Sequence, residues 1–404
     1  MIANGALIEF PTTREEAWRY TPVDEVMARI ETATRAHSVS VSRTIVDALA
    51  GRHGGPRLVF VNGSYHAGLS DRDGLVAGLR CGPRSPSAVE VATASAAPVD
   101  GFIARNGAPD QDIAVVEVDP GTQAPLPVHI VYLATPDRSD PARSTISHPR
   151  TVIDVADGGR ISIIETYCGL DGPTVTSAST TIRVGCDADV DHYLIQTESS
   201  QAMHVGDIRI RQAARARMRL TAVTVGGDIA RHAITVDLAG TDAQADVAGV
   251  DATTRRQRHD TVVTVDHAAP RCSSSQRFRA VVDDHARSSF SGQIIVRPGA
   301  EAADAHQSSR NLVLSPNAEA DTRPWLQILT DDVRCSHGAT VGRLDDEALF
   351  YLRSRGIPRR TAHAMLIDAF VHDVTGRVAH SSLRTHLDEL VGEQTEKSGA
   401  DETR

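Results

Sequence analysis

The sequence is almost without lysine. Its one lysine is Lys397, so 41 of the 42 basic residues among 404 are arginine. A P-loop needs a lysine on the nucleotide phosphates, and a Schiff-base enzyme needs a lysine amine. Lys397 lies in a tail that we predict to be disordered, so we expect neither chemistry. The motifs G-x-S-x-G and H-E-x-x-H and any nucleotide fingerprint are also missing.

Aromatic residues and basic clusters are scarce as well. Aromatics make up 4% of the chain against 41% hydrophobic residues, so Val, Ile, Leu and Ala must build the core. Such residues suit repetitive β architectures with narrow interiors. The net charge is −10, and no basic block is interleaved with aromatics. We therefore expect no nucleic-acid surface.

Export and membrane signals are missing too. The N-terminus lacks the basic and apolar regions of a signal peptide, and no apolar run approaches the length of a transmembrane helix. Cysteines are odd in number, scattered and without a C-x-x-C pair: Cys81, Cys168, Cys186, Cys272 and Cys335. These features predict a reducing, cytoplasmic location, with neither a disulfide framework nor a closed zinc site.

What is present divides into three regions. Residues 1–111 are mixed and helical: helix starts are expected near Thr13 and after Pro22, a strand and turn over 57–65, and a loose linker over 82–98. Residues 112–337 form a β core. Residues 338–404 are helical, with helices opening near Leu344 and Pro358, a third over 383–390, and a disordered tail from 393.

The β core carries a repeat. Strand positions recur 29 and then 28 residues apart, at Ile153, Ile182 and Ile210 and again at Ile161, Val190 and Met218. Each unit is a strand, a tight corner rich in Gly or Asp, and a strand. The period favours a β-solenoid whose coils stack to bury a common core; a β-sandwich with long hairpins is the alternative. Later the spacing shortens to 17, at Ala286, Ala303 and Ala320.

The stretch from Asp331 to Gly342 holds the most suggestive chemistry. Cys335 and His337 are two residues apart, so in a strand both side chains point to one side. A thiolate and an imidazole are good ligands for soft metals. Free cysteine is also a common core residue, and no neighbouring Cys or His completes a metal site. Any further ligands must come from elsewhere in the fold or from another chain.

Other polar residues are weaker candidates. The pairs Asp283-Asp284 and Asp331-Asp332 could be the catalysts of a β-helix enzyme acting on carbohydrate, although corner turns explain them better. Seven histidines are spread along the core, and we expect most of them at the surface: His192, His204, His232, His259, His267, His285 and His306.

The segment from Asp331 to Gly342, continuing from Leu344 to Ile357, resembles the C-terminal signature of SufD in the SufB/SufD family of iron–sulfur cluster assembly scaffolds. The likeness extends to four further segments: Glu16 to Pro22, Arg258 to Thr261, Phe290 to Val296, and Ser308 to Ser315. The resemblance implies a right-handed parallel β-helix flanked by helical N- and C-terminal regions. It also implies a scaffold without catalytic activity.

The resemblance implies partners and sites as well. Such chains pair with SufB, receive sulfur through it from a desulfurase system, and bind the ATPase SufC through the C-terminal helices. A reduced flavin can accompany the complex. The family's interface histidine corresponds to His337, a transient iron ligand, with Cys335 beside it. We place SufC binding around Leu349, Leu352, Met365 and Phe370. A related chain recruited to one specialised pathway is the remaining alternative.

Overall fold

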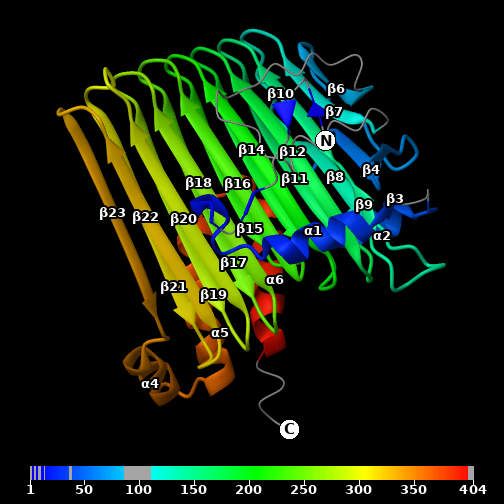
Figure 1. Cartoon of the computed structure of the whole chain (residues 1–404), viewed down its shortest axis with the longest axis vertical. Coiled ribbons are helices and arrows are strands. Elements are labelled where there is room, and N and C mark those ends of the chain that lie inside the picture. Colours follow the sequence, from blue (N-terminus) through cyan, green and yellow to red (C-terminus); the bar gives the residue numbers. More distant parts are fainter. Residues whose placement is uncertain are drawn as a thin grey trace.

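Two long sheets face each other and give the chain the form of a flattened solenoid (Figure 1). The computed structural model describes residues 2–3, 6–7, 11–12, 14–35, 39–85 and 111–398. Strands hold 47% of the chain and helices 17%, and the solenoid makes about seven turns. The predicted mainly-β solenoid is confirmed. The pairs between successive coils are parallel, which rules out the hairpin sandwich.

Within the described residues the first sheet has eleven strands, and from β10 onward its strands alternate along the chain with those of the second sheet. The bounds of the first sheet are β3 Thr34–Arg35, β6 Leu79–Arg84, β7 Ile113–Val118, β9 Thr145–Ser147, β10 Arg150–Val155, β12 Thr174–Val184, β14 Met203–Gln212, β16 Ile229–Leu238, β18 Arg258–His267, β20 Arg287–Val296 and β22 Glu319–Ile328.

The second sheet has ten strands. They are β4 Arg57–Val61, β5 Ser64–Tyr65, β8 Val128–Ala134, β11 Arg160–Gly169, β13 Asp189–Thr197, β15 Arg217–Thr224, β17 Gln244–Thr253, β19 Ser273–Val282, β21 Ala303–Val313 and β23 Val333–Gly342. β4 pairs in parallel with β8, so a strand from the N-terminal region joins the solenoid sheet. A separate short pair, β1 Ile2–Ala3 and β2 Ala6–Leu7, is antiparallel.

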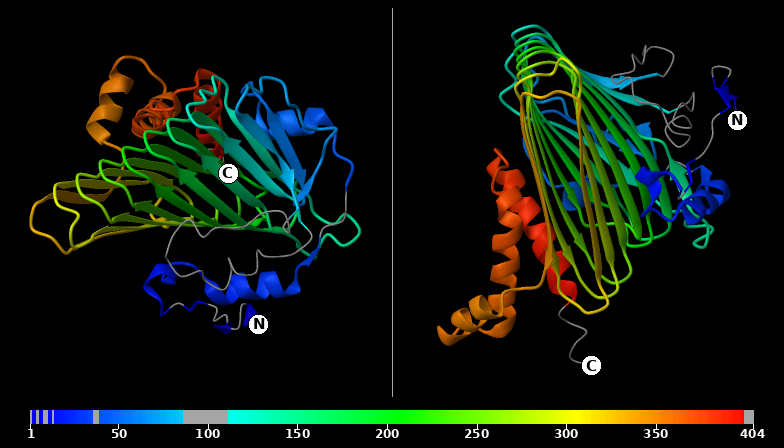
Figure 2. Two further views of the ribbon diagram at one scale, coloured as in Figure 1. Left: turned by 90° about the horizontal axis from the view of Figure 1, so that it is seen from above. Right: turned by 60° about the vertical axis from the view of Figure 1, so that its left-hand side comes forward.

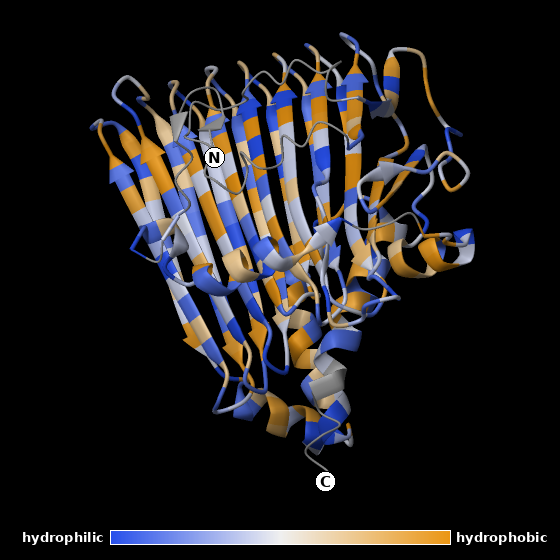
Figure 3. Cartoon of the chain, turned by 45° about the vertical axis from the view of Figure 1, so that its right-hand side comes forward, coloured by the Kyte–Doolittle hydropathy of each residue, from blue (hydrophilic) through white to orange (hydrophobic). Residues whose placement is uncertain are grey.

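Stacked columns of side chains explain why the coils form. One column in the first sheet runs through seven successive coils, at positions 153, 182, 210, 236, 265, 294 and 326. Successive side chains in a strand point to opposite faces, and hydrophobic and hydrophilic residues form bands along the strands (Figure 3). The lumen column is aliphatic, and it is buried as far as position 294 and half-buried at 326, so each coil completes the core of its neighbours.

The repeat does not shorten toward the end. The last intervals in this column are 29 (265 to 294) and 32 (294 to 326). Ala286 ends the corner before β20, Ala303 is the first residue of β21 after the corner on the opposite edge, and Ala320 is the second residue of β22. The spacing of 17 therefore measures half a coil, and the sequence prediction was wrong on this point.

Several corner residues have a left-handed backbone conformation and form hydrogen bonds to the corners of neighbouring coils. Asp187 and Asp284 have φ of 57° and 56°, as predicted for acidic corner residues. Arginine also occupies this conformation, at Arg215 with φ of 57°. Its guanidinium donates two hydrogen bonds to Asp187 one coil earlier, at 2.7 and 2.6 Å, and its backbone N–H donates to Thr241 one coil later. Contacts between coils thus stabilise a left-handed backbone conformation that arginine disfavours in isolation.

Helices cover the outer faces of both sheets (Figure 2). α1 (Val23–Thr32), preceded by a short 3₁₀ turn at Glu16–Trp18, packs on the first sheet, and α2 (Arg43–Ala50) packs beside β4, β8 and β11. α5 (Arg359–Thr375) and α6 (Ser381–Ser398) pack on the second sheet. α4 (Asp346–Ser354) projects beyond it (Figure 1). None of the helices within the described residues is long and apolar enough to cross a membrane.

Two helical expectations need correction. Residues 393–398, predicted as disordered, belong to α6, while 399–404 lie outside the described residues. The helix expected near Thr13 is the short 3₁₀ turn, and Thr13 itself is outside the described residues. Within the predicted linker, residues 82–84 belong to β6, and 86–98 lie outside the described residues. The boundaries at 111/112 and 337/338 stay predictions.

Asp251 in the lumen gives a test of the core. Burial raises the pKa of its carboxyl to about 7, against hydrogen bonds from Ser288 and Thr261 that lower it. The folded chain keeps this proton up to about pH 7, whereas the unfolded chain releases it near pH 4. The free energy of unfolding should therefore fall between pH 4 and 7 and level off above.

We expect Asp251→Asn to flatten this pH dependence. Above pH 7 the variant should be more stable than the native chain by at most about 4 kcal/mol, the equivalent of roughly three pKa units. Urea unfolding at pH 4.5 and pH 8 measures the difference. An equal loss of stability at both pH values would contradict the assignment.

Candidate functional site

The predicted Cys–His pair lies in the last strand of the solenoid. β23 pairs with β21 on one side and ends the order of the second sheet. In the register of these two parallel strands, Cys335 lies opposite Ala305, and His337 lies opposite Gln307. Both columns begin in the buried lumen, at Ile161 and Ile163, and the predicted placement on one side of the strand is confirmed.

Cys335 belongs to the apolar end of the core. It packs with a small cluster that includes Ile294, Val296 and Ala305, and it is half-buried. Burial raises the pKa of its thiol, and the charge of Asp304 raises it further, against a hydrogen bond from the Ala305 backbone. This environment favours the neutral thiol over the thiolate that binds metal.

His337 is exposed, although its column is buried in earlier coils. The next position inward is Gln307, which is 3% exposed. The lumen opens at this last coil, because no further coil covers β22 and β23 within the described residues. The sequence could indicate His337 through its neighbour Cys335, but Gln307 is 30 residues away, and only the coil register brings the two together.

The described residues contain no group of three or more His, Cys, Asp and Glu side chains able to hold a metal. The other four cysteines are free thiols. Burial raises the thiol pKa of three of them: Cys81, Cys168 and Cys272. Cys335 and His337 can supply at most two ligands, whereas a tetrahedral metal site needs four.

The remaining candidates fall elsewhere. Asp283 and Asp284 form a corner between β19 and β20, where Asp284 accepts the Arg255 N–H at 2.8 Å. Asp331 and Asp332 form a corner on the opposite edge of the solenoid. Five of the seven core histidines are buried, contrary to the expectation of surface positions: His192, His204, His232, His259 and His267.

The predicted SufC-binding residues differ in accessibility. Leu349 and Leu352 on α4 are half-buried, and Met365 on α5 is 44% exposed. Phe370 packs against the cluster between α5, α6 and the second sheet. The most exposed aromatic side chains of this region are two that the sequence prediction left out, Phe350 and Tyr351, at 74% and 57% exposure.

Two of the segments that carry the resemblance meet in space. Thr21 and Arg231 both donate to the carboxylate of Asp260, which also accepts from Ser289 at 2.6 Å. The Arg231 guanidinium lies 3.8 Å from the ring centre of Trp18. All of these side chains are buried. The N-terminal segment is therefore fixed to the first sheet by a charged core.

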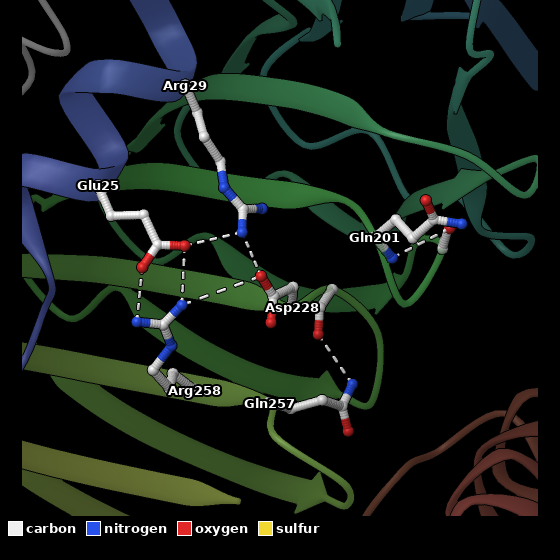
Figure 4. Close-up of polar contacts among 8 residues, drawn as sticks. Glu25, Arg29, Gln201, Asp228, Gln257 and Arg258 are labelled. Carbon is white, nitrogen blue, oxygen red and sulfur yellow. Dashed lines mark hydrogen bonds and ion pairs between the residues drawn. The ribbon is translucent and has the colours of Figure 1, made fainter. Parts of the chain in front are cut away.

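A second ionic group joins α1 to the first sheet (Figure 4), and its side chains are partly exposed. Glu25 of α1 binds Arg29 of the same helix and Arg258 of β18, at 2.8 and 2.7 Å. Asp228, at a corner of the solenoid, binds Arg29 and lies 3.9 Å from Arg258. The hydrogen bond and charge of Arg258 lower the pKa of the Glu25 carboxyl. These contacts set the position of α1 along the sheet.

Comparison with known proteins agrees with this architecture. Residues 138–370, 233 of 404 and thus more than half of the chain, match the family model described as SUF system FeS cluster assembly, SufBD core domain. The iron–sulfur cluster assembly protein SufD of Escherichia coli is 29% identical over 389 residues, covering 95% of this chain and 89% of that protein.

Two further relatives extend the comparison. A SufBD family protein of Synechocystis is 29% identical over 404 residues, covering 96% of this chain and 88% of its own. The chloroplastic protein ABCI7 of Arabidopsis thaliana is 32% identical over 292 residues, covering 70% of this chain and 61% of its own. The chain belongs to the SufBD family of iron–sulfur cluster assembly proteins.

Proposed function

We propose that this chain is a non-catalytic scaffold subunit that pairs with SufB and binds the ATPase SufC to build and transfer nascent iron–sulfur clusters in the cytoplasm. The observation that carries this is the last coil. It presents an exposed imidazole, that of His337, at an open end of the solenoid with too few ligands to close a metal site.

Docking of SufB against this end is supported by the edge strands. β23 ends the second sheet, so one row of its backbone N–H and C=O groups has no neighbouring strand within the described residues. The last coil also carries exposed apolar side chains, those of Trp325, Ile328, Leu329 and Val341. In β22, by contrast, Pro324 removes one backbone donor from the edge. SufB ligands would then complete the coordination of iron begun by His337.

The role of Cys335 in this proposal is secondary. Its raised thiol pKa and its packing against Ala305 suit a residue that closes the core of the last coil. His337 therefore carries the iron contact, with iron and sulfide treated as cargo. Flavin binding to the complex stays a prediction.

We place SufC on α4 and the start of α5. Exposed aromatic side chains are the usual anchors of an interface, and Phe350, Tyr351 and Met365 offer three apolar side chains there. SufC would supply the energy, because its nucleotide-driven dimerisation could move the two scaffold chains relative to each other and expose the His337 region for loading.

Charge substitution on α4 tests this placement. We expect Phe350→Glu with Tyr351→Glu to reduce copurification of SufC at least tenfold, because hot-spot aromatics contribute about 2 kcal/mol or more each. The fold should persist, since both side chains are exposed. Leu126→Glu is the matched control, an exposed apolar residue that precedes β8. Equal SufC recovery from the double variant and the control would refute the placement.

Coexpression tests the proposal as a whole. We expect the chain to copurify with SufB and SufC as one complex, and isolated chains to show no glycan turnover. Failure to form a complex with either partner would overturn the scaffold assignment. Glycan hydrolysis that Asp283→Ala abolishes would instead favour the carbohydrate enzyme.

A further inference from the structure

A chain of side-chain amides leads through the lumen to His337. The amide nitrogen of Gln307 donates to the side-chain oxygen of Gln276 at 2.9 Å, and Gln276 in turn donates to the backbone carbonyl of Gln293 at 3.4 Å. Gln276 and Gln307 are 1% and 3% exposed. The Gln307 amide donates to the preceding coil of its own sheet, and the Gln276 amide donates to β20 of the opposite sheet, so neither amide donates toward the last coil. The remaining acceptor, the side-chain oxygen of Gln307, is buried and has no hydrogen-bond partner.

The register places His337 beside that acceptor. Gln276, Gln307 and His337 occupy one column in three successive coils, where adjacent strands lie about 4.8 Å apart. The nitrogen and oxygen of an amide point to different sides of its terminal carbon. With the Gln307 nitrogen directed to the preceding coil, its oxygen faces the following coil, which carries His337. A buried carbonyl oxygen without a donor costs free energy, and an imidazole N–H can satisfy it.

A glycine in the opposite sheet leaves room for this amide. A Cβ atom added to Gly292 would lie 1.5 Å from the Gln307 nitrogen and 2.7 Å from its terminal carbon. Neither contact is possible, so an alanine at 292 would displace the amide. Gly292 lies in β20, in the Phe290 to Val296 segment, and Gln307 directly precedes the Ser308 to Ser315 segment. Two of the segments that carry the resemblance thus meet around this side chain.

We propose that Gln307 is a positioning residue for His337: its oxygen accepts the N–H of one ring nitrogen, which fixes the tautomer and leaves the other nitrogen free to bind iron. The proposal rests on the proposed role of His337. Histidines that bind metals commonly donate their second ring N–H to a carbonyl or carboxylate, and loss of that partner costs about 10- to 100-fold in metal affinity or activity. Gln276, which is itself bonded to the Gln293 carbonyl, accepts from the Gln307 nitrogen. This leaves the Gln307 oxygen as the atom that can accept a hydrogen bond from His337.

Nitrogen-15 NMR of the full chain labelled at histidine tests the hydrogen bond directly. At pH 8 we expect His337 to give two separate ring-nitrogen shifts, one protonated and one bare, assigned by their loss in His337→Ala. Gln307→Met, similar in size but without an acceptor, should move both shifts toward an average. Gln307→Glu, which can still accept, should restore two separate shifts. Averaged shifts in the native chain, or no change in Gln307→Met, would overturn the proposal.

Iron content separates this proposal from the function on which it rests. In the complex with SufB and SufC, we expect Gln307→Met to weaken iron retention about 10- to 100-fold, with normal subunit recovery. If His337→Ala retains iron fully, the assembly role fails, while the NMR result still decides the hydrogen bond. If His337→Ala loses iron and Gln307→Met does not, the positioning role alone is wrong.

Discussion

We expect His337→Ala to abolish most cluster delivery in cells while the solenoid stays folded. His337 is exposed at the end of its column, so loss of the ring removes no core contact. The expected loss is at least tenfold in the activity of client enzymes that depend on the Suf system, because removal of a ligand from an incomplete site leaves no substitute nearby. Client activity in cells that rely on this chain measures the effect.

A neighbouring histidine provides the control. His306 lies on β21, directly inside β23, but it faces the outer surface, where its ring contacts Ser336 at 2.6 Å. His306→Ala changes the same residue type within one strand of the site, and we expect normal client activity. Equal effects of the two substitutions would mean that the site tolerates imidazole loss or depends on the strand as a whole.

The second large effect is on stability. We expect Asp260→Ala to cost about 3–5 kcal/mol locally, because it leaves the buried guanidinium of Arg231 without its carboxylate. Thr21 and Ser289 lose the same acceptor. The N-terminal segment should then detach from the first sheet at lower urea concentrations than the solenoid core requires.

Tryptophan fluorescence can follow this step. The chain has two tryptophans, so Trp325→Phe leaves Trp18, which lies against Arg231, as the reporter. The double variant Arg231→Met with Asp260→Leu should recover much of the loss, since apolar pairs replace buried ion pairs well. Asp187→Ala, which breaks an exposed pair with Arg215, should change the midpoint far less. An unchanged Trp18 transition in Asp260→Ala would show that the network does not hold the segment.

The solenoid could be predicted because each coil repeats the same pattern of apolar residues in the sequence. Ile153, Ile182 and Ile210 fall at the same place in successive coils, and stacking requires apolar residues at that place in every coil. The later coils were harder to follow because corner lengths vary between the two edges. The interval from Ala286 to Ala303 therefore runs from one edge of the solenoid to the other, which is half a coil.

Burial within the solenoid was less predictable. His204 and His232 lie in lumen columns with ring centres 4.8 Å apart, and Glu198 binds His204 at 2.8 Å. Most of the core histidines were expected at the surface, and the sequence does not show that stacked coils bring these two together. Glu198 is six residues away from His204 in sequence across a corner, and only the fold shows that both side chains turn inward.

The site was predictable only in its local part. Two residues on one strand, Cys335 and His337, must share a side, and this follows from strand geometry alone. The raised pKa of the Cys335 thiol, the open lumen at the last coil and the amide of Gln307 depend on coils about 30 residues apart. The accessible aromatics of α4 were missed because the sequence does not show that this helix projects beyond the sheet.

The most direct test is the iron and sulfide content of the complex purified with SufB and SufC. We predict that the native chain yields a complex carrying both, and that His337→Ala yields the same three subunits in normal proportion with at least a tenfold loss of iron and sulfide. Full iron and sulfide in the His337→Ala complex, or no complex with the native chain, would contradict a scaffold that assembles clusters at the open end of its solenoid.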